Sequence, residues 1–419
     1  MKLARRIAGV AAGVGLAAAF AVQAQAAEPV KFGICYDLSK AYTFISPQVL
    51  QGAKDLATLM NMKGGLEGHP IEMVVQDHGN EPQRGIECYE RLKREGVMIF
   101  DTLSTPVSIA VLPRIMQDQN ILLQSLVGRG DAIDGDVFKW VFPVGPTYWG
   151  QAANDIEFIR QKSGGKLEGV KVAFVYLDYP FGQEPIGILK KLAEKEGFDL
   201  QLFPVPLPGN DQATTWSQMR RFQPDWIISW MFSNAHVVAS REMKRNGIPI
   251  TKYLSVNWLN EIDIRNIGPE AAAGLKRGTN VAGGQEVPII AEIIEKVYGA
   301  GKGAGDRKAI EDVYYNTGVA IYSVAFEAVR KAIADHGWPL TPQKVKAGFE
   351  SLKEFDANGL LAPVTVTASD HGGGGKTRVE TWDGTKWVPE TDWLSAYTDV
   401  VWEKVREESA KFAKDQAKQ

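Results

Sequence analysis

Large aromatic side chains crowd the loops at the ends of the strands that the sequence predicts. They are Tyr42, Tyr148, Trp149, Tyr179, Phe181, Trp230, Phe232 and Trp258. Aromatic residues on strands are more often core than ligand contacts, and Trp226 and Trp230 are expected to include core positions. The aromatic residues of the loops would instead suit a flat or apolar ligand that is buried in a cleft. The chemistry they indicate is recognition of a small molecule.

One cation, Arg129, stands in the loop expected after a strand at 121–124. Its guanidinium group could grip a ligand carboxylate through two parallel hydrogen bonds. A surface ion pair with Asp131 or Asp134 is equally open from the sequence. If Arg129 faces the aromatic loops, an aromatic or hydrophobic carboxylate becomes a candidate ligand.

Motifs for catalysis or cofactor binding are absent from the sequence. It contains no Gly-x-Ser-x-Gly elbow, Walker loop, paired metal motif or dinucleotide glycine fingerprint. The glycine run 372–375 has no strand-to-helix context and is expected to be a flexible turn. The histidines at 69, 78, 236, 336 and 371 have no spacing that places two ligands on one helical face beside a third. We therefore expect no enzyme activity, no cofactor and no metal.

The elements that must position these residues alternate between strands and helices. A first run has strands at 30–35, 71–76, 97–100 and 121–124, with helices at 47–62, 82–95 and 107–118. A second run has strands at 171–176, 200–204, 226–230 and 253–256, with helices near 149 and at 184–196, 214–221 and 235–246. This alternation predicts an α/β fold with two doubly wound parallel sheets in series. Ligands of such sheets bind beyond the carboxyl ends of the strands, where the loops named above lie.

Three segments are expected to cross between the two lobes: 142–146, 278–284 and 360–365. The first lobe would then contain 27–144 and 279–362, and the second 145–278 and 363–402. Hinge closure around a ligand is the expected motion. A β-hairpin is expected at 377–393, around Asp383-Gly384, and residues 403–419 form a charged tail that is helical or frayed.

The first 26 residues have the features of an export signal. Lys2, Arg5 and Arg6 precede an apolar run over 7–22, and Ala24-Gln25-Ala26 supplies small residues for cleavage. The run is short for a membrane span and no lipobox Cys follows, so a soluble periplasmic protein without membrane insertion is expected. Cleavage takes the formal net charge from −3 to −6. An acidic chain is a poor partner for nucleic acid or anionic lipid.

Two cysteines, Cys35 and Cys88, lie in the first predicted strand and the second predicted helix. A disulfide between them could form and persist in the periplasm. A pair of buried free thiols is equally compatible with the sequence, because sequence alone does not give the Cα separation that a bridge requires.

Short motifs follow one another in a distinctive order along nearly the whole mature chain. They are Gly33, Asn61-Met62-Lys63-Gly64-Gly65-Leu66-Glu67-Gly68, the segment Asp77–Pro82, Phe142-Pro143-Val144-Gly145-Pro146-Thr147, Asp178-Tyr179-Pro180-Phe181-Gly182, Asp370-His371-Gly372 and Asp383-Gly384-Thr385-Lys386-Trp387. Their order and spacing resemble those of the leucine/isoleucine/valine-binding proteins. The resemblance implies a type I periplasmic solute-binding protein that serves an ABC importer.

The resemblance also implies where a ligand would be held. Family members bind an α-carboxylate through hydroxyls and backbone amides of the first lobe, at positions that match Ser104, Thr105, Gly128 and Arg129. Ser104 and Thr105 precede Pro106, so helix capping is the plainer role, and it is compatible with ligand binding at the same helix N-terminus. Arg129 departs from the family, which usually has a small or hydroxyl residue there.

The second lobe departs further from that family. Members use an acidic residue after the second strand of this lobe to hold the ligand's ammonium group, since a buried cation needs an anion. The corresponding loop, 208–212, has no Glu, and Asp211 could either substitute or cap the next helix. Phe181 stands at the family's aromatic contact but lacks a hydroxyl. An ordinary branched-chain amino acid is therefore only one candidate ligand.

The expected ligand contacts are Tyr42, Ser104, Thr105, Gly128, Arg129, Tyr148, Tyr179, Phe181, Asp211, Phe232, Asn257 and Trp258. We expect a monomeric substrate-binding component of an ABC importer, which delivers a small organic solute to an inner-membrane permease. The solute would be an aromatic or hydrophobic carboxylate, or an amino acid or amide. The alternative is a periplasmic sensor of the same architecture that feeds a membrane receptor.

Overall fold

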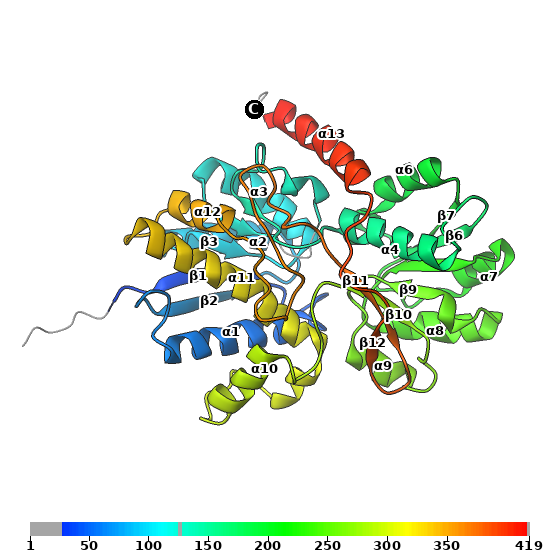
Figure 1. Ribbon diagram of the computed structural model, residues 1–419, viewed down its shortest axis with the longest axis horizontal. Helices are drawn as coiled ribbons and strands as arrows, with labels where there is room; N and C mark the ends of the chain where they lie inside the picture. The colour runs from blue at the N-terminus through cyan, green and yellow to red at the C-terminus, as the bar shows by residue number, and fades with distance from the viewer. Residues whose placement is uncertain (1–26, 125–127, 417–419) are drawn as a thin grey trace, which may run out of the picture.

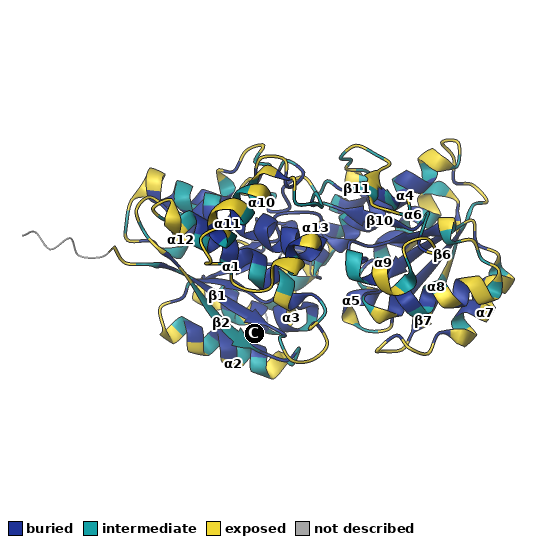
Figure 2. Cartoon of the chain, turned by 90° about the horizontal axis from the view of Figure 1, so that it is seen from below, coloured by how far each residue is buried: buried dark blue, intermediate teal, exposed yellow. Residues whose placement is uncertain are grey.

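The computed structural model describes residues 27–124 and 128–416, so the expected export signal lies outside the described residues. The chain forms two lobes, each built on its own sheet with helices packed around it (Figure 1). Buried residues concentrate in the sheets and on the inner faces of the helices (Figure 2). The expected α/β fold with two doubly wound parallel sheets is confirmed. Within the described ranges, no helix combines the length and apolar character needed to cross a membrane.

The first sheet has the strand order β2-β1-β3-β4-β5, and all neighbouring strands in it are parallel. Its strands are β1 (Val30–Tyr36), β2 (Ile71–Asp77), β3 (Ile99–Asp101), β4 (Ile121–Leu123) and β5 (Val141–Phe142). The helices of this lobe are α1 (Ser46–Met62), α2 (Pro82–Arg94), α3 (Thr105–Asp118), α10 (Pro288–Glu292), α11 (Val313–His336) and α12 (Pro342–Glu350). Short helical turns are η1 (Gly130–Ile133), η3 (Ile293–Tyr298) and η4 (Arg307–Glu311).

The second sheet has the order β12-β11-β10-β9-β8-β6-β7. Its strands are β6 (Lys171–Leu177), β7 (Asp199–Val205), β8 (Trp226–Trp230), β9 (Tyr253–Ser255), β10 (Lys276–Thr279), β11 (Arg378–Trp382) and β12 (Trp387–Pro389). Its helices are α4 (Tyr148–Lys162), α5 (Pro180–Gln183), α6 (Ile186–Glu196), α7 (Ala213–Phe222), α8 (Asn234–Asn246) and α9 (Glu261–Ile267), with the turn η2 (Ile250–Lys252). The predicted hairpin is confirmed as antiparallel β11 and β12. Asp383 holds its turn by accepting hydrogen bonds from the amides of Thr385 and Lys386.

Helices α1 and α11 approach closely because each offers a glycine at their contact. A Cβ on Gly52 would lie 2.3 Å from the carbonyl oxygen of Tyr315, and one on Gly318 would lie 2.0 Å from that of Val49. No larger residue fits at either position without separating the two backbones. No helix or strand was expected within residues 285–350, so the sequence did not predict this central contact of the first lobe.

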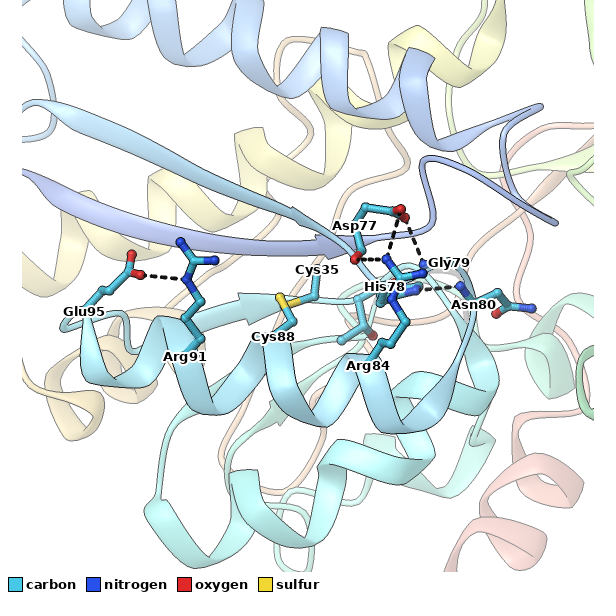
Figure 3. The surroundings of a disulfide bond; sticks show 10 residues. Cys35, Asp77, His78, Gly79, Asn80, Arg84, Cys88, Arg91 and Glu95 are labelled. Atoms are coloured by element: carbon cyan, nitrogen blue, oxygen red, sulfur yellow. Dashed lines mark hydrogen bonds and ion pairs between the residues drawn. A yellow bond between two sulfur atoms is a disulfide. The ribbon is translucent and has the colours of Figure 1, made fainter.

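Cys35 and Cys88 form a disulfide that joins β1 to α2 (Figure 3). Their Cα atoms are 6.1 Å apart, within the range that a disulfide spans. Both residues are buried. Of the two possibilities that the sequence left open, the structure has the bridge.

The segments that cross between the lobes are joined to one another by hydrogen bonds. The amide of Gly145 donates to the carbonyl oxygen of Gly372 at 3.1 Å, and that of Ala282 donates to Leu360 at 2.8 Å. Residues 364–371, however, bond to the first lobe, for example from the amide of Val366 to the carbonyl of Leu352. The third crossing therefore follows Gly372 and is not at the expected 360–365. The remaining lobe bounds stay a prediction.

Candidate functional site

A cavity lies between the lobes, beyond the carboxyl ends of strands from both sheets. Its lining is Tyr42, Phe44, Ile45, Leu103, Thr105, Tyr148, Phe181, Phe232 and Trp258. Six of these nine residues are aromatic, and none carries a charge. The space enclosed by these side chains has room for only about one water molecule. The site is therefore an apolar, nearly filled pocket in a closed arrangement of the lobes.

Two contacts close this pocket from opposite lobes. The hydroxyl oxygens of Tyr42 and Tyr179 lie 2.6 Å apart in a hydrogen bond. The ring of Phe44 stacks on that of Phe232 with centroids 4.6 Å apart and an interplanar angle of 16°. Asp37 organises the first-lobe loop by accepting a hydrogen bond from the amide of Tyr42 at 2.8 Å.

The first lobe presents the beginning of α3 to the cavity. Ser104 is the N-cap, and its hydroxyl accepts from the amide of Val107 at 3.4 Å, so the predicted capping role is confirmed. The same hydroxyl donates to Asn80 at 2.7 Å. Leu103 has a φ of +39°, a left-handed conformation that costs an L-residue about 1–3 kcal/mol and tends to occur at functional sites.

Thr105 and Gly128 lie together beside this helix start. The Gly128 amide donates to the Thr105 hydroxyl at 3.0 Å. A Cβ on Gly128 would lie 2.7 Å from the methyl group of Thr105, so only glycine fits there. Thr105 lines the cavity, and Gly128 contacts Thr105 without lining the cavity itself.

Trp258 is held by residues of both lobes. Its indole Nε1 donates to the hydroxyl of Tyr148 at 3.0 Å. Its carbonyl oxygen accepts from the hydroxyl of Tyr314, on α11 of the first lobe, at 2.9 Å. It also accepts from Nε2 of His236 at 3.1 Å. Burial lowers the pKa of His236 to about 4, so the ring is neutral at pH 7 and donates from Nε2. These bonds set the orientation of the Trp258 ring at the cavity.

Six of the twelve expected ligand contacts line the cavity: Tyr42, Thr105, Tyr148, Phe181, Phe232 and Trp258. Tyr179, Gly128 and Ser104 adjoin it through the contacts described above. Asn257, Asp211 and Arg129 are not among the lining residues. Asn257 is buried directly before Trp258. The expected core position of Trp230, on β8, is confirmed by its full burial.

Arg129 pairs with Asp131, one of the two partners that the sequence left open, but the pair is mostly buried and does not lie at the surface. Its Nε and Nη2 donate to the two carboxylate oxygens of Asp131 at 2.9 and 2.7 Å. Its guanidinium carbon lies 5.0 Å from the ring centroid of Phe138 and 4.4 Å from that of Phe412. The guanidinium is therefore already engaged outside the cavity, which corrects the expectation that it grips a ligand carboxylate.

Asp211 is exposed and does not reach the cavity. Nor does it cap α7, whose N-cap residue is Gln212 without a side-chain cap bond. Gln212 instead bonds the carbonyls of Gly209 and Ala235 and the indole of Trp216. The position of Asp211 thus gives no support to the expectation that its carboxylate pairs with the ammonium group of a ligand.

Three lining residues, Phe44, Ile45 and Leu103, are not among the expected ligand contacts. Neither is Glu184, which does not line the cavity but joins the two lobes. Glu184 belongs to the second lobe, and its Oε1 accepts a hydrogen bond from the Gly130 amide of the first lobe at 2.7 Å. Burial raises the pKa of Glu184 to about 7, and the nearby charge of Asp131 raises it further. The hydrogen bond from Gly130 and the positive charges of Arg129 and Lys404 lower this pKa, but their effect is smaller than that of burial. Glu184 was predicted to begin a helix, but α5 ends before it and Pro185 precedes α6. Proline after a short helix is the signal that could have identified this turn.

Possible metal ligands do not gather in the described part of the chain. Within 27–124 and 128–416, no group of three or more His, Cys, Asp or Glu residues could hold a metal ion. The arrangement offers burial, aromatic contact and a few hydroxyl and amide groups. These suit the reversible enclosure of a small molecule.

Solved structures resemble this chain over most of its length. The ABC transporter permease from the Pseudomonas fluorescens group is 32% identical, with a TM-score of 0.85 over 92% of this chain and 97% of that one. A branched-chain amino acid ABC transporter from Thermus thermophilus with bound valine is 19% identical, with a TM-score of 0.78 over 91% and 99%. A solute-binding protein from R. palustris in complex with benzoate is 16% identical, with a TM-score of 0.69 over 88% and 98%.

Sequence comparison agrees with these likenesses. The Leu/Ile/Val-binding protein homolog 8 of Brucella abortus is 22% identical over 254 residues, which are 59% of this chain and 62% of that relative. The chain thus matches somewhat less than two thirds of that relative's length. A family model described as "Periplasmic binding protein" matches residues 29–386. With two lobes, a shared hinge and an enclosed site between them, the chain belongs to the periplasmic binding protein family, and its resemblance to the leucine/isoleucine/valine-binding proteins is confirmed.

Proposed function

We propose that this chain is the periplasmic substrate-binding component of an ABC importer and that it captures a small organic solute between its lobes. Membership of a binding-protein family and the likeness to ABC transporter proteins support this role. The partner would be an inner-membrane permease. That permease would recognise the closed form, in which the surfaces of both lobes are aligned.

We favour an aromatic or hydrophobic carboxylate over an amino acid as the solute. The observation that carries this choice is the uncharged lining, in which six of nine side chains are aromatic. An α-ammonium group buried there would lack the anion that a buried cation requires. A carboxylate could instead receive hydrogen bonds from the hydroxyl and the backbone amide of Thr105 at the start of α3. The benzoate bound by the R. palustris relative belongs to this class, whereas the valine of the Thermus relative does not.

Binding would require the lobes to open and the aromatic contacts to separate. The closed pocket has room for only about one water molecule, so a ligand cannot enter it as it stands. Opening would part Phe44 from Phe232 and Tyr42 from Tyr179, and the ligand would take the place of the direct contact between the rings. Closure would then bury the ligand's apolar surface, which stabilises the complex by about 25 cal/mol for each Å² that is removed from water.

Isothermal titration calorimetry of the mature protein tests the solute class. The decisive pair is 3-phenylpropanoate and phenylalanine, which differ only in the ammonium group. The proposal expects 3-phenylpropanoate to bind at least about tenfold more tightly, a difference of about 1.4 kcal/mol. Benzoate and benzamide form a second pair, which tests the need for the carboxylate. Tighter binding of phenylalanine than of 3-phenylpropanoate would refute the choice of class.

An uptake experiment tests the transport role separately. A strain that lacks the gene should no longer take up the radiolabelled ligand found by calorimetry, and the wild-type gene should restore uptake. Unchanged uptake in that strain, with the ligand still bound by the purified protein, would favour delivery to a membrane receptor.

A further inference from the structure

The C-terminal helix α13 (Thr398–Gln416) lies across both lobes. It follows the hairpin of the second lobe and runs back over the first (Figure 1). Residues 403–419 were expected to be a charged tail, either helical or frayed, and the structure has the helix up to Gln416. One stripe of the helix is nevertheless apolar or small and buried, with Val401, Val405 and Ser409 spaced by four residues. This spacing places them on one face of a helix, so α13 is a docked element of the fold.

The first half of α13 contacts the second lobe. Asp399 pairs with Lys195 at 2.8 Å, and Glu403 pairs with Lys191 at 2.9 Å. The ammonium group of Lys404 lies 4.5 Å from the ring centroid of Trp149. Because the two ion pairs are largely exposed, solvent screens them and each contributes little to the stability of this contact.

The second half of α13 contacts the first lobe. Phe412 stacks on Phe138 with ring centroids 4.6 Å apart. The guanidinium group of Arg129 lies over both rings and forms a bidentate pair with Asp131. Ser409 donates a hydrogen bond to Asp134 at 2.5 Å, and both of these side chains are buried. This end is therefore anchored by packing as well as by charge.

The anchor on the first lobe is the same loop that meets the second lobe beside the cavity. We name residues 128–134 the anchor loop. Within it, Gly130 packs on Trp149 so closely that a Cβ would lie 2.3 Å from the indole ring. The Gly130 amide also donates to Glu184 across the lobes. A displacement of the anchor loop would break both contacts, and it would also move Gly128 away from Thr105.

We propose that α13 is an interlobe strap that limits opening, and that Phe412 is a positioning residue that holds the anchor loop against the second lobe. Because α13 contacts both lobes, rotation of the lobes about the hinge would disturb its contacts with at least one of them. The contacts of α13 therefore add to the free energy of opening and shift the ligand-free population toward the closed form. The strap acts in the ligand-free protein, so it does not depend on which solute the cavity binds.

The test measures the distance between the lobes in the ligand-free, full-length mature protein. Spin labels are attached at Met62→Cys on α1 and Arg220→Cys on α7, both exposed positions, and the distance distribution is measured by double electron–electron resonance. The native cysteines are buried in their disulfide and do not compete for the label. Phe412→Ala should move population toward the distances of an open form. An unchanged distribution in folded Phe412→Ala would overturn the proposal.

Two matched variants on the same helix sharpen the result. Phe412→Tyr keeps the stack and should retain the parent distribution. Lys411→Ala removes an exposed side chain that pairs with Glu407 and Glu408 of α13 itself, and should also leave the distribution unchanged. A shift of equal size in Lys411→Ala would mean that the helix responds to any change, which contradicts a specific role for Phe412.

Arg129→Lys provides an independent variant if Phe412→Ala does not fold, as judged by circular dichroism. Lysine keeps the charge opposite Asp131 but loses the bidentate pairing and the planar group between the two rings. The strap predicts a shift toward open distances here as well. A parent-like distribution in Arg129→Lys would then count against the strap.

Discussion

The hydroxyl oxygen of Tyr42 in the first lobe lies 2.6 Å from that of Tyr179 in the second. The two residues are 137 positions apart in the sequence, and only closure of the lobes brings them together. Burial raises the pKa of both phenols, so both are neutral at pH 7 and one donates to the other. This bond closes the polar edge of an otherwise apolar pocket and is a direct link between closure and ligand enclosure.

Tyr42→Phe should weaken ligand binding because closure loses this hydrogen bond. A neutral hydrogen bond contributes about 0.5–1.5 kcal/mol net, which corresponds to a rise in Kd of about two- to tenfold. Calorimetry with the ligand identified as above measures the change. Tyr179→Phe should have the same effect, and the double variant should be no weaker than either single one. Additive losses in the double variant would show that the two hydroxyls act separately.

Ligand affinity should fall as the pH rises from about 5 to 8 because of Glu184. Burial in the closed form raises the pKa of Glu184 to about 7 from its ordinary value of 4.5, so the closed form binds the proton more tightly than an open form with an exposed carboxyl. The protonated Glu184 carboxyl therefore stabilises the closed form fully below pH 4.5, and this stabilisation is lost as the pH rises through about 7. Kd measured across this range checks the sign.

Glu184→Gln should make the ligand Kd nearly independent of pH between about 5 and 8, because glutamine does not titrate. Its side-chain oxygen can still accept the hydrogen bond from the Gly130 amide. The control is Asp178→Asn, an exposed carboxylate nearby in sequence that bonds Gln183, and it should leave the slope unchanged. Persistence of the full slope in Glu184→Gln would assign the pH dependence to another group.

Removal of the disulfide should destabilise the first lobe without changing the cavity. The bridge joins residues 53 positions apart, and in the chain-entropy description a loop of this size contributes about 4 kcal/mol. Cys35→Ala together with Cys88→Ala should lower the free energy of unfolding by about that amount, measured by urea denaturation. A loss below about 1 kcal/mol would show that β1 and α2 stay paired in the unfolded chain or that packing replaces the bridge.

Phe44→Ala should change which ligands fit. It removes the ring that stacks on Phe232 and leaves space for a second aromatic ring. The affinity for 2-naphthoate relative to benzoate should rise about tenfold, since burial of the additional ring carbons is worth more than about 1 kcal/mol. Titration of both acids measures the ratio. Phe44→Tyr, which keeps the ring, should leave the ratio near that of the parent, and an equal rise there would contradict a size effect.

Local pattern was sufficient for most elements of both sheets. Strand β8 begins and ends at the expected residues, and the Asp383-Gly384 turn correctly located the hairpin. Strand β8 is a short apolar run that is buried on both faces, and Gly384 in the hairpin turn has a φ of +107°, so each leaves a local signal in the sequence. Helix α11 was missed because it is buried on nearly every side, and a helix without a polar face has no amphipathic period.

The site was only partly predictable for a related reason. Six aromatic and hydroxyl residues could be placed at the cavity because the carboxyl ends of parallel strands converge at one edge. The sequence could not decide the role of Arg129, because its partner Phe412 follows 283 residues later. Phe412 also lies in a highly charged segment, whose composition does not indicate that the helix packs against the rest of the protein. Glu184 was missed because its significance lies in the Gly130 amide across the lobes.

By itself, the sequence determined the α/β alternation, the two-lobed class and the aromatic character of the loops, since these depend on residue type and short-range spacing. Only the tertiary structure decided that the cysteines are bridged, that Arg129 is engaged outside the pocket and that α13 spans the lobes. Each of these depends on which distant surfaces meet, and that is set by the packing of the whole chain, not by any local period.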